Sequence, residues 1–106
     1  MPKYLLKANY STQGIAGLAD KGGTARSDVV GKMVAGLGGT LECFYFAWGE
    51  TDAYVIVDVP SDEVMASIAL SVNQSGAASF STVPLLTPAQ VDQAARSLPD
   101  YTAPGA

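Results

Sequence analysis

The sequence contains no histidine and only one cysteine, Cys43, among its 106 residues. The absence of histidine excludes Ser-His-Asp and Cys-His nucleophilic catalysis, histidine-ligated zinc or haem, and proton transfer by imidazole. One cysteine forms neither an internal disulfide nor a multi-cysteine metal site, and the carboxylates are scattered along the chain. We therefore expect no metal and no cofactor to be held by the chain's own side chains. Cys43 itself is typical of a small buried hydrophobe rather than a nucleophile.

Charged residues are also scarce, at 15% of the chain, and six basic residues against ten acidic ones give a net charge of −4. An acidic domain repels the phosphate backbone, so we expect no nucleic acid as a partner. No apolar run approaches the roughly 18 residues that span a bilayer. Lys7 and Asn9 interrupt the first apolar stretch, which excludes a signal-peptide core there. We expect a soluble, cytoplasmic protein with no membrane partner.

The remaining composition predicts one compact domain over residues 1–106, because 48% of the residues are hydrophobic and a chain of this size can bury a core. Alternating and aromatic-rich segments predict strands over residues 2–9, 40–48, 53–59 and 78–86. Helical spacing between caps and glycine or proline stops predicts helices over 12–21, 24–37, 62–74 and 88–98. Thr24 is the candidate cap of the second helix.

These elements follow the order β-α-β-β-α-β with a C-terminal helical extension, the first helical region being split at Gly22-Gly23. This is the plan of the ferredoxin-like fold, an α+β architecture with helices on one face of an antiparallel sheet. The second and third strands form a hairpin. Pro84 favours an edge position for the fourth strand, because proline donates no backbone hydrogen bond.

The hairpin alternation gives the sheet two apolar faces. A two-residue turn at Glu50-Thr51 would pair Gly49 with Asp52 and fix the register. One face, expected to pack against the helices, then carries Phe44, Phe46, Val55 and Val57. The opposite face, mixed but too apolar for water, carries Cys43, Tyr45, Ala47, Tyr54, Ile56 and Asp58. Because one layer of helices covers one face only, we predict a homo-oligomer, at least a dimer, in which the sheets of two copies pack together.

Four short motifs, taken in order, resemble the GYD domain family: Tyr4-Leu5-Leu6, Gly38-Gly39, Gly49-x-x-Asp52 and Val57-Asp58-Val59-Pro60. The likeness runs from about Tyr4 to about Tyr101. It implies a ferredoxin-like subunit of the dimeric α/β-barrel superfamily, whose members include antibiotic-biosynthesis-type monooxygenases, chlorite-dismutase-like haem proteins and effector-binding domains of leucine-responsive regulators. The resemblance implies a fold but no reaction. The family's usual tyrosine before the aspartate is Thr51 here, so no role of that tyrosine is carried over.

The mixed sheet face holds the first candidate site, formed by Lys7, Asn9, Tyr45, Tyr54 and Asp58. Tyrosines with polar tips beside charged groups are typical of a small-molecule pocket. In such a pocket Lys7 would hold an anionic substrate and Asp58 would act as a base. The alternative is an ion pair between Lys7 and Asp58 inside a packed dimer interface.

Trp48, at the end of the hairpin, extends this candidate site. The resemblance to cofactor-independent monooxygenases implies a possible pair of Asn9 and Trp48, since some of those enzymes use asparagine and tryptophan with a further polar residue. The alternative is that Trp48 fills the core or covers one end of a barrel.

A second candidate site lies between Lys21 and Arg26, in the segment Lys-Gly-Gly-Thr-Ala-Arg. Glycines before a helix N-terminus, flanked by two cations, are able to hold an anion. The G-x-x-x-x-G-K-[ST] spacing of a P-loop is absent. The alternative is a hinge between two helical segments with solvated charges.

Three functions remain compatible with the sequence. The favoured one is a binding module, a small dimer that binds a small molecule or partner in a cavity at the sheet face. The second is an enzyme of the cofactor-independent monooxygenase or isomerase type, whose catalytic residues the sequence does not name. The third is an effector-binding regulatory domain, which would lack an attached DNA-binding helix-turn-helix here.

Overall fold

A computed structural model describes all 106 residues and contains four strands and four helices. In chain order these are β1 (Lys3–Tyr10), α1 (Thr12–Lys21), α2 (Gly23–Gly36), β2 (Thr40–Phe46), β3 (Ala53–Asp58), α3 (Asp62–Gln74), β4 (Ala78–Leu85) and α4 (Pro88–Ala95). Every predicted strand and helix is therefore present. None of the helices is long and apolar enough to cross a membrane.

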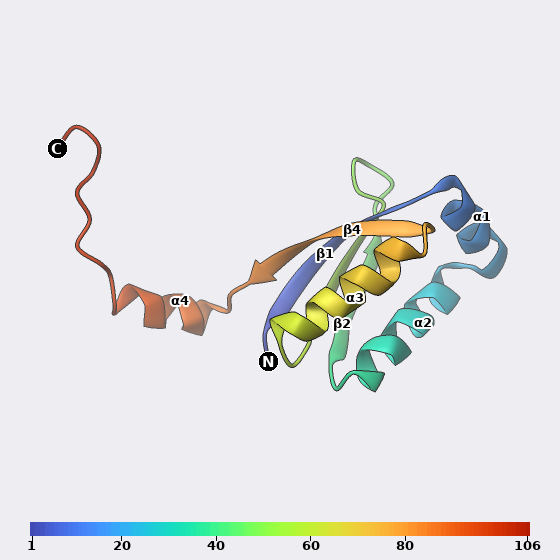
Figure 1. Cartoon of the computed structure of the whole chain (residues 1–106), viewed down its shortest axis with the longest axis horizontal. Helices are drawn as coiled ribbons and strands as arrows, with labels where there is room; N and C mark the ends of the chain where they lie inside the picture. The colour runs from blue at the N-terminus through green and yellow to red at the C-terminus, as the bar shows by residue number, and fades with distance from the viewer.

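The four strands form one antiparallel sheet in the order β2-β3-β1-β4, and α1, α2 and α3 lie together on one side of it (Figure 1). This α+β arrangement is compatible with the ferredoxin-like plan. β4 is an edge strand, as Pro84 predicted, because the missing N–H of proline is harmless where no further strand pairs.

The core lies between the sheet and the helices. Tyr4 and Leu6 of β1 and the valines of β3 pack there against Val34 of α2 and Ile68 of α3. Phe44 of β2 is partly buried against the same cluster, so the predicted inner face is confirmed. The phenol of Tyr4 donates a hydrogen bond to the carboxylate of Asp62, which ties the start of β1 to the first turn of α3.

The hairpin between β2 and β3 differs from the prediction. The N–H of Ala47 donates to the carbonyl of Asp52 at 2.9 Å, so four residues, 48–51, form the loop instead of two. Phe44 consequently lies opposite Val55 rather than Val57, and a bulge interrupts the pairing between Leu41 and Cys43. The shift in register is two residues. Because side chains alternate with a period of two, an even shift leaves every residue on its predicted face.

The junction of α1 and α2 also differs in detail. α2 begins at Gly23 with Gly22 as its N-cap, whereas the sequence favoured Thr24 as the cap. Gly22 has φ +90, a conformation that side-chain-bearing residues rarely adopt, so a single glycine ends one helix and begins the next.

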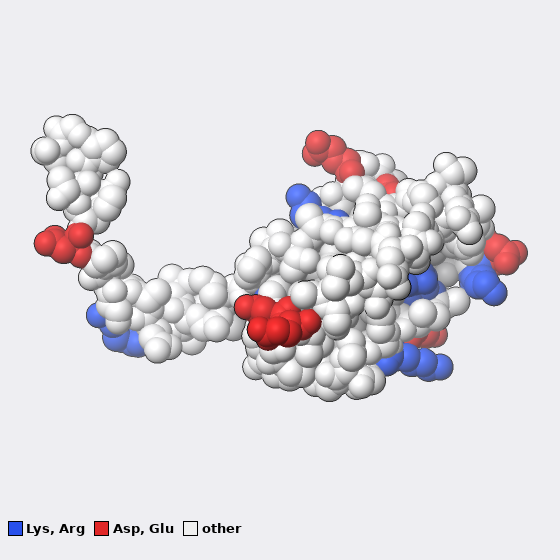
Figure 2. Space-filling view, viewed as in Figure 1, with Lys and Arg blue, Asp and Glu red and all other residues white.

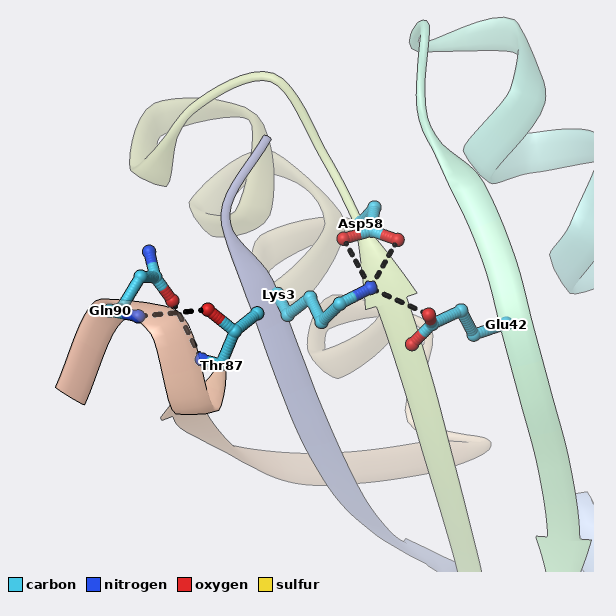
Figure 3. Close-up of polar contacts among 5 residues, drawn as sticks. All are labelled: Lys3, Glu42, Asp58, Thr87 and Gln90. Atoms are coloured by element: carbon cyan, nitrogen blue, oxygen red, sulfur yellow. Dashed lines mark hydrogen bonds and ion pairs between the residues drawn. The ribbon is translucent and has the colours of Figure 1, made fainter. Parts of the chain in front are cut away.

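The C-terminal segment stands apart from the sheet. α4 and the tail project away from the rest of the chain in Figure 1, and the molecule measures 57 Å along its longest axis against 22 Å along its shortest. A capping box fixes the start of α4, with Thr87 Oγ1 accepting from the N–H of Gln90 and Gln90 Oε1 accepting from the N–H of Thr87 (Figure 3). This segment therefore does not cover the outer face of the sheet.

Candidate functional site

One row of side chains crosses all four strands on the outer face of the sheet, the face away from the helices. Tyr45 lies opposite Tyr54, Tyr54 opposite Lys7, and Lys7 opposite Ser81. Tyr45 is 68% exposed and Tyr54 38%. The register thus brings together three of the residues predicted for this site, Lys7, Tyr45 and Tyr54, and adds Ser81 from β4, which the sequence did not single out. We call these four residues the tyrosine–lysine row.

The neighbouring row is apolar. The strand register places Cys43 opposite Ile56, Ile56 opposite Leu5, and Leu5 opposite Val83. These four residues, the apolar row, are only partly covered within one chain. Side chains of adjacent rows on one face are about 7 Å apart along a strand, so the apolar row borders the tyrosine–lysine row directly.

The third row is ionic and contains Asp58. The ammonium of Lys3 lies 2.9 Å from Asp58 Oδ2 and 2.6 Å from Glu42 Oε1 (Figure 3). These hydrogen bonds, that to Glu42 first, raise the pKa of Lys3 above its ordinary value of 10.5. Within one chain Asp58 therefore pairs with Lys3, and the alternative pairing of Lys7 with Asp58 across a dimer interface stays a prediction. Lys3, not Lys7, lies opposite Asp58, and four residues of strand separate the two lysines by about 13 Å.

Asn9 lies on the outer face beyond the tyrosine–lysine row, where it holds the hairpin loop. Its Oδ1 accepts the N–H of Asp52 at 3.2 Å, and Asp52 Oδ2 in turn accepts the N–H of Tyr10 at 3.0 Å. Asp52 is therefore a structural clamp between the loop and the end of β1. Thr51, in place of the family tyrosine, is buried at the base of the same loop.

Trp48 does not join the outer-face site. It is 56% exposed, has φ 57, and stacks on Phe46 with 5.4 Å between ring centroids. Trp48 does not fill the core, because it is mostly exposed and its indole lies against the ring of Phe46, the last residue of β2. Asn9 and Trp48 are engaged in separate local contacts, and neither lines the two cavities on the helix side of the sheet.

A cavity of the chain lies on the opposite side of the sheet, among the helices. It is a groove of about 500 Å³ between α1, α2, the end of α3 and the start of β4, and both Lys21 and Arg26 line it. The turn at Gly22 places the last residue of α1 and the first turn of α2 around the same space. The second predicted pair of site residues is thus brought together, and Figure 2 shows basic side chains over this α1–α2 end of the molecule, with acidic ones beside them.

Tyr10 is the residue of this groove that the sequence analysis missed. Burial raises the pKa of its phenol, Arg26 acts in the opposite direction, and Asp52 adds a further increase. A phenol is neutral near pH 7 already at its ordinary pKa of 10.0, so the Tyr10 hydroxyl can donate a hydrogen bond there. Its position at the end of β1, next to the cap Ser11, is a signal that could have placed it at the mouth of the helix layer. A smaller space of about 50 Å³ adjoins the groove on the core side, and Tyr10 and Arg26 line both.

The acidic and thiol groups do not converge. No three side chains among the aspartates, glutamates and the cysteine lie close enough together to hold a metal ion. Cys43 is partly covered within the apolar row and forms no disulfide. The arrangement offers binding groups, namely cations, phenols and apolar walls, on both sides of the sheet.

The family comparison agrees with this fold. The family model of the GYD domain matches residues 4–95, which is most of the chain. No curated protein and no solved structure matches the sequence significantly. The matched range includes all of the sheet except Lys3, the helix-side groove and the Asn9–Asp52 clamp, and it ends with the last residue of α4. The chain therefore belongs to the GYD domain family.

Proposed function

We propose that the protein is a homodimeric binding module in which the outer sheet faces of two copies pack together as a dimeric α/β barrel and enclose a small-molecule or partner site. The observation that carries the proposal is the uncovered apolar row, Cys43, Ile56, Leu5 and Val83, on a sheet whose packed helices, α1, α2 and α3, lie on the other side. A face of this kind on a small domain is usually an interaction surface.

The surface area of the single chain supports the same proposal. One chain exposes 6991 Å², whereas a compact monomer of this mass exposes roughly 5,600 Å². Part of the excess belongs to the projecting α4 segment, and part to the open sheet. A dimer contact of standard size hides about 800 Å² per partner, which one face of a four-stranded sheet can supply.

The tyrosine–lysine row gives the proposed interface its binding chemistry. Lys7 has no carboxylate partner within the chain, because Lys3 occupies both Asp58 and Glu42. A cation left free beside two phenols is suited to an anionic or hydrogen-bonding ligand. Asp58 is engaged by Lys3 in the ionic row, so it supports the interface rather than acting as a base.

The test is the mass of the protein in solution at micromolar concentration, measured by size-exclusion chromatography with light scattering. Wild type should have the mass of two chains. Ile56→Asp places a charge in the apolar row and should shift the mass toward one chain with loss of stability. Leu70→Asp is the matched control, because Leu70 is 72% exposed on α3, on the helix side of the sheet.

A folded wild-type monomer at this concentration would overturn the proposal. Equal effects of Ile56→Asp and Leu70→Asp on the mass would show that the sheet face is not the contact. The ligand part is tested separately with Lys7→Gln, which should keep the dimer mass and weaken binding of any ligand that copurifies or is found by screening.

A further inference from the structure

The helix-side groove is a second binding surface, independent of the proposed dimer face, because the sheet separates the two. Its volume of about 500 Å³ falls within the range of about 300–1,000 Å³ that small-molecule sites occupy. The groove is formed by secondary structure on every side, with α1 and α2 forming one wall and α3 with the start of β4 the other. Helices and strands hold side chains more firmly than loops do.

The charges around this groove are unbalanced. Lys21 and Arg26 line it, and no aspartate or glutamate does. The ion pairs of the chain are all made by Lys3, so neither cation has an acidic partner. Arg26 is also partly buried. A guanidinium withdrawn from water is normally paired with an anion, and here the chain supplies none.

Neutral hydrogen-bond donors accompany the two cations. Tyr10 lines the groove, and its phenol is neutral near pH 7 and can donate a hydrogen bond. Gly22 is the N-cap of α2, so no capping side chain accepts a hydrogen bond from the first N–H groups of that helix. This helix start lies between Lys21 and Arg26. All of these groups favour a negative charge at the α1–α2 junction.

The rest of the lining is apolar or small. Leu18, Val29, Met33 and Val72 provide apolar surface, while Gly14 and Gly17 leave one wall without side chains. A Cβ atom at Gly14 would lie 2.0 Å from the carbonyl oxygen of Ala77, so α1 packs directly against the backbone there. At Gly17 no atom lies within 4 Å of the position that a Cβ would take, so a flat apolar body can approach the α1 wall closely at that residue.

We infer that the groove binds a small organic acid, a flat apolar body with one carboxylate. The carboxylate lies between Arg26 and Lys21 and accepts a hydrogen bond from Tyr10, and the apolar body lies toward Leu18, Met33 and Val72. The planar fork of arginine matches the two oxygens of a carboxylate, and two unpaired cations are enough for one such group.

The experiment is isothermal titration calorimetry of the whole chain with two matched probes, 2-naphthoate and the neutral 2-naphthalenemethanol. The acid should bind saturably, and the alcohol at least about tenfold more weakly, because the two differ in the charged head group alone. Arg26→Gln should weaken binding of the acid about tenfold or more, and Lys21→Gln several-fold. Lys32→Gln is the matched control, since Lys32 is a basic residue of α2 outside the groove and should leave the affinity unchanged.

Three results would overturn the inference: no saturable binding of 2-naphthoate, equal affinities for the acid and the alcohol, or wild-type affinity in both Lys21→Gln and Arg26→Gln. Thermal melts identify a variant that fails to fold. In that case two variants decide whether the inference holds. Lys21→Gln changes an exposed residue, and Arg26→Lys keeps the positive charge but loses the planar fork of the guanidinium. The oligomeric state is measured separately, so a monomeric protein that still binds the acid contradicts the proposed dimer and not this site.

Discussion

The ammonium of Lys3 lies 2.9 Å from Asp58 Oδ2, across the pairing of β1 with β3, and the same ammonium also contacts Glu42 of β2. One cation therefore joins three strands at one end of the sheet. Each carboxylate would otherwise repel the other on the same face, so the central position of Lys3 removes a like-charge contact. This pairing is also what leaves Lys7 free in the tyrosine–lysine row.

The raised pKa of Lys3 predicts a stability contribution that depends on pH. Because the folded-state pKa lies above the ordinary 10.5, the contribution is complete below about pH 10.5 and is lost as pH rises through the folded-state value. Lys3→Gln should therefore be less stable than wild type at pH 7, and the difference should shrink at the alkaline end. Thermal melts of both proteins from pH 7 to 11 measure it. A difference that persists unchanged in 1 M salt would contradict the ionic origin.

The buried phenol of Tyr4 predicts a late step in the alkaline titration of the tyrosines. Its hydrogen bond to Asp62, and then burial, raise its pKa from 10.0 to about 12. The neutral phenol is the form that the fold stabilises, so this contribution is present below pH 10 and is lost toward pH 12. Near-ultraviolet absorbance should show one of the five tyrosines ionising last. Tyr4→Phe should remove that step, and a last step that persists in Tyr4→Phe would contradict the assignment.

The two glycines before β2 should respond differently to alanine. Gly38 has φ +83, so Gly38→Ala should cost on the order of 1 kcal/mol of unfolding free energy. Gly39 has no unusual φ, yet a Cβ there would lie 2.3 Å from the carbonyl oxygen of Asp58. Gly39→Ala should therefore cost about 3 kcal/mol or more, as overpacking against backbone does. Urea denaturation compares them, and equal losses would contradict the close approach.

Alanine substitutions at two positions of α3 should differ in their effect on the unfolding free energy, because one position lies in the core and the other on the surface. Ile68 is 2% exposed within the core, whereas Leu70 faces solvent. Ile68→Ala should lower the unfolding free energy by about 2–5 kcal/mol, and Leu70→Ala by less than about 0.5 kcal/mol. Both are measured by chemical denaturation. A large loss in Leu70→Ala would show that the outer side of α3 is covered in solution.

The capping box of α4 should matter locally and not globally. Thr87→Ala removes the acceptor of the Gln90 N–H, which costs a helix about 1 kcal/mol. An eight-residue helix that stands clear of the sheet is marginal alone. Hydrogen exchange of residues 88–95 should therefore speed up, while the global unfolding midpoint stays unchanged. A lower midpoint would show that α4 packs against another chain.

Properties of neighbouring residues determined where the helices and strands form. The caps Ser61 and Thr87, the glycine stops and the period-two alternation of the strands are properties of a few neighbouring residues, so the sequence predicted all eight elements and the two faces of the sheet. The family resemblance was confirmed as well. The face assignment even survived an error in the turn, because a register shift of two residues preserves alternation.

Only the tertiary structure decided which side chains meet. The four-residue loop, held by the contacts of Asp52 with Asn9 and Tyr10, changed the register and left Trp48 exposed against Phe46 rather than in the core. The register between β1 and β3 places Asp58 opposite Lys3 instead of Lys7. The φ of a single residue, Gly22, set the angle that brings Lys21 and Arg26 to one groove. Contacts of this kind depend on strand register and helix orientation, which are fixed jointly by residues distant in sequence. Alternation and capping depend only on neighbouring residues.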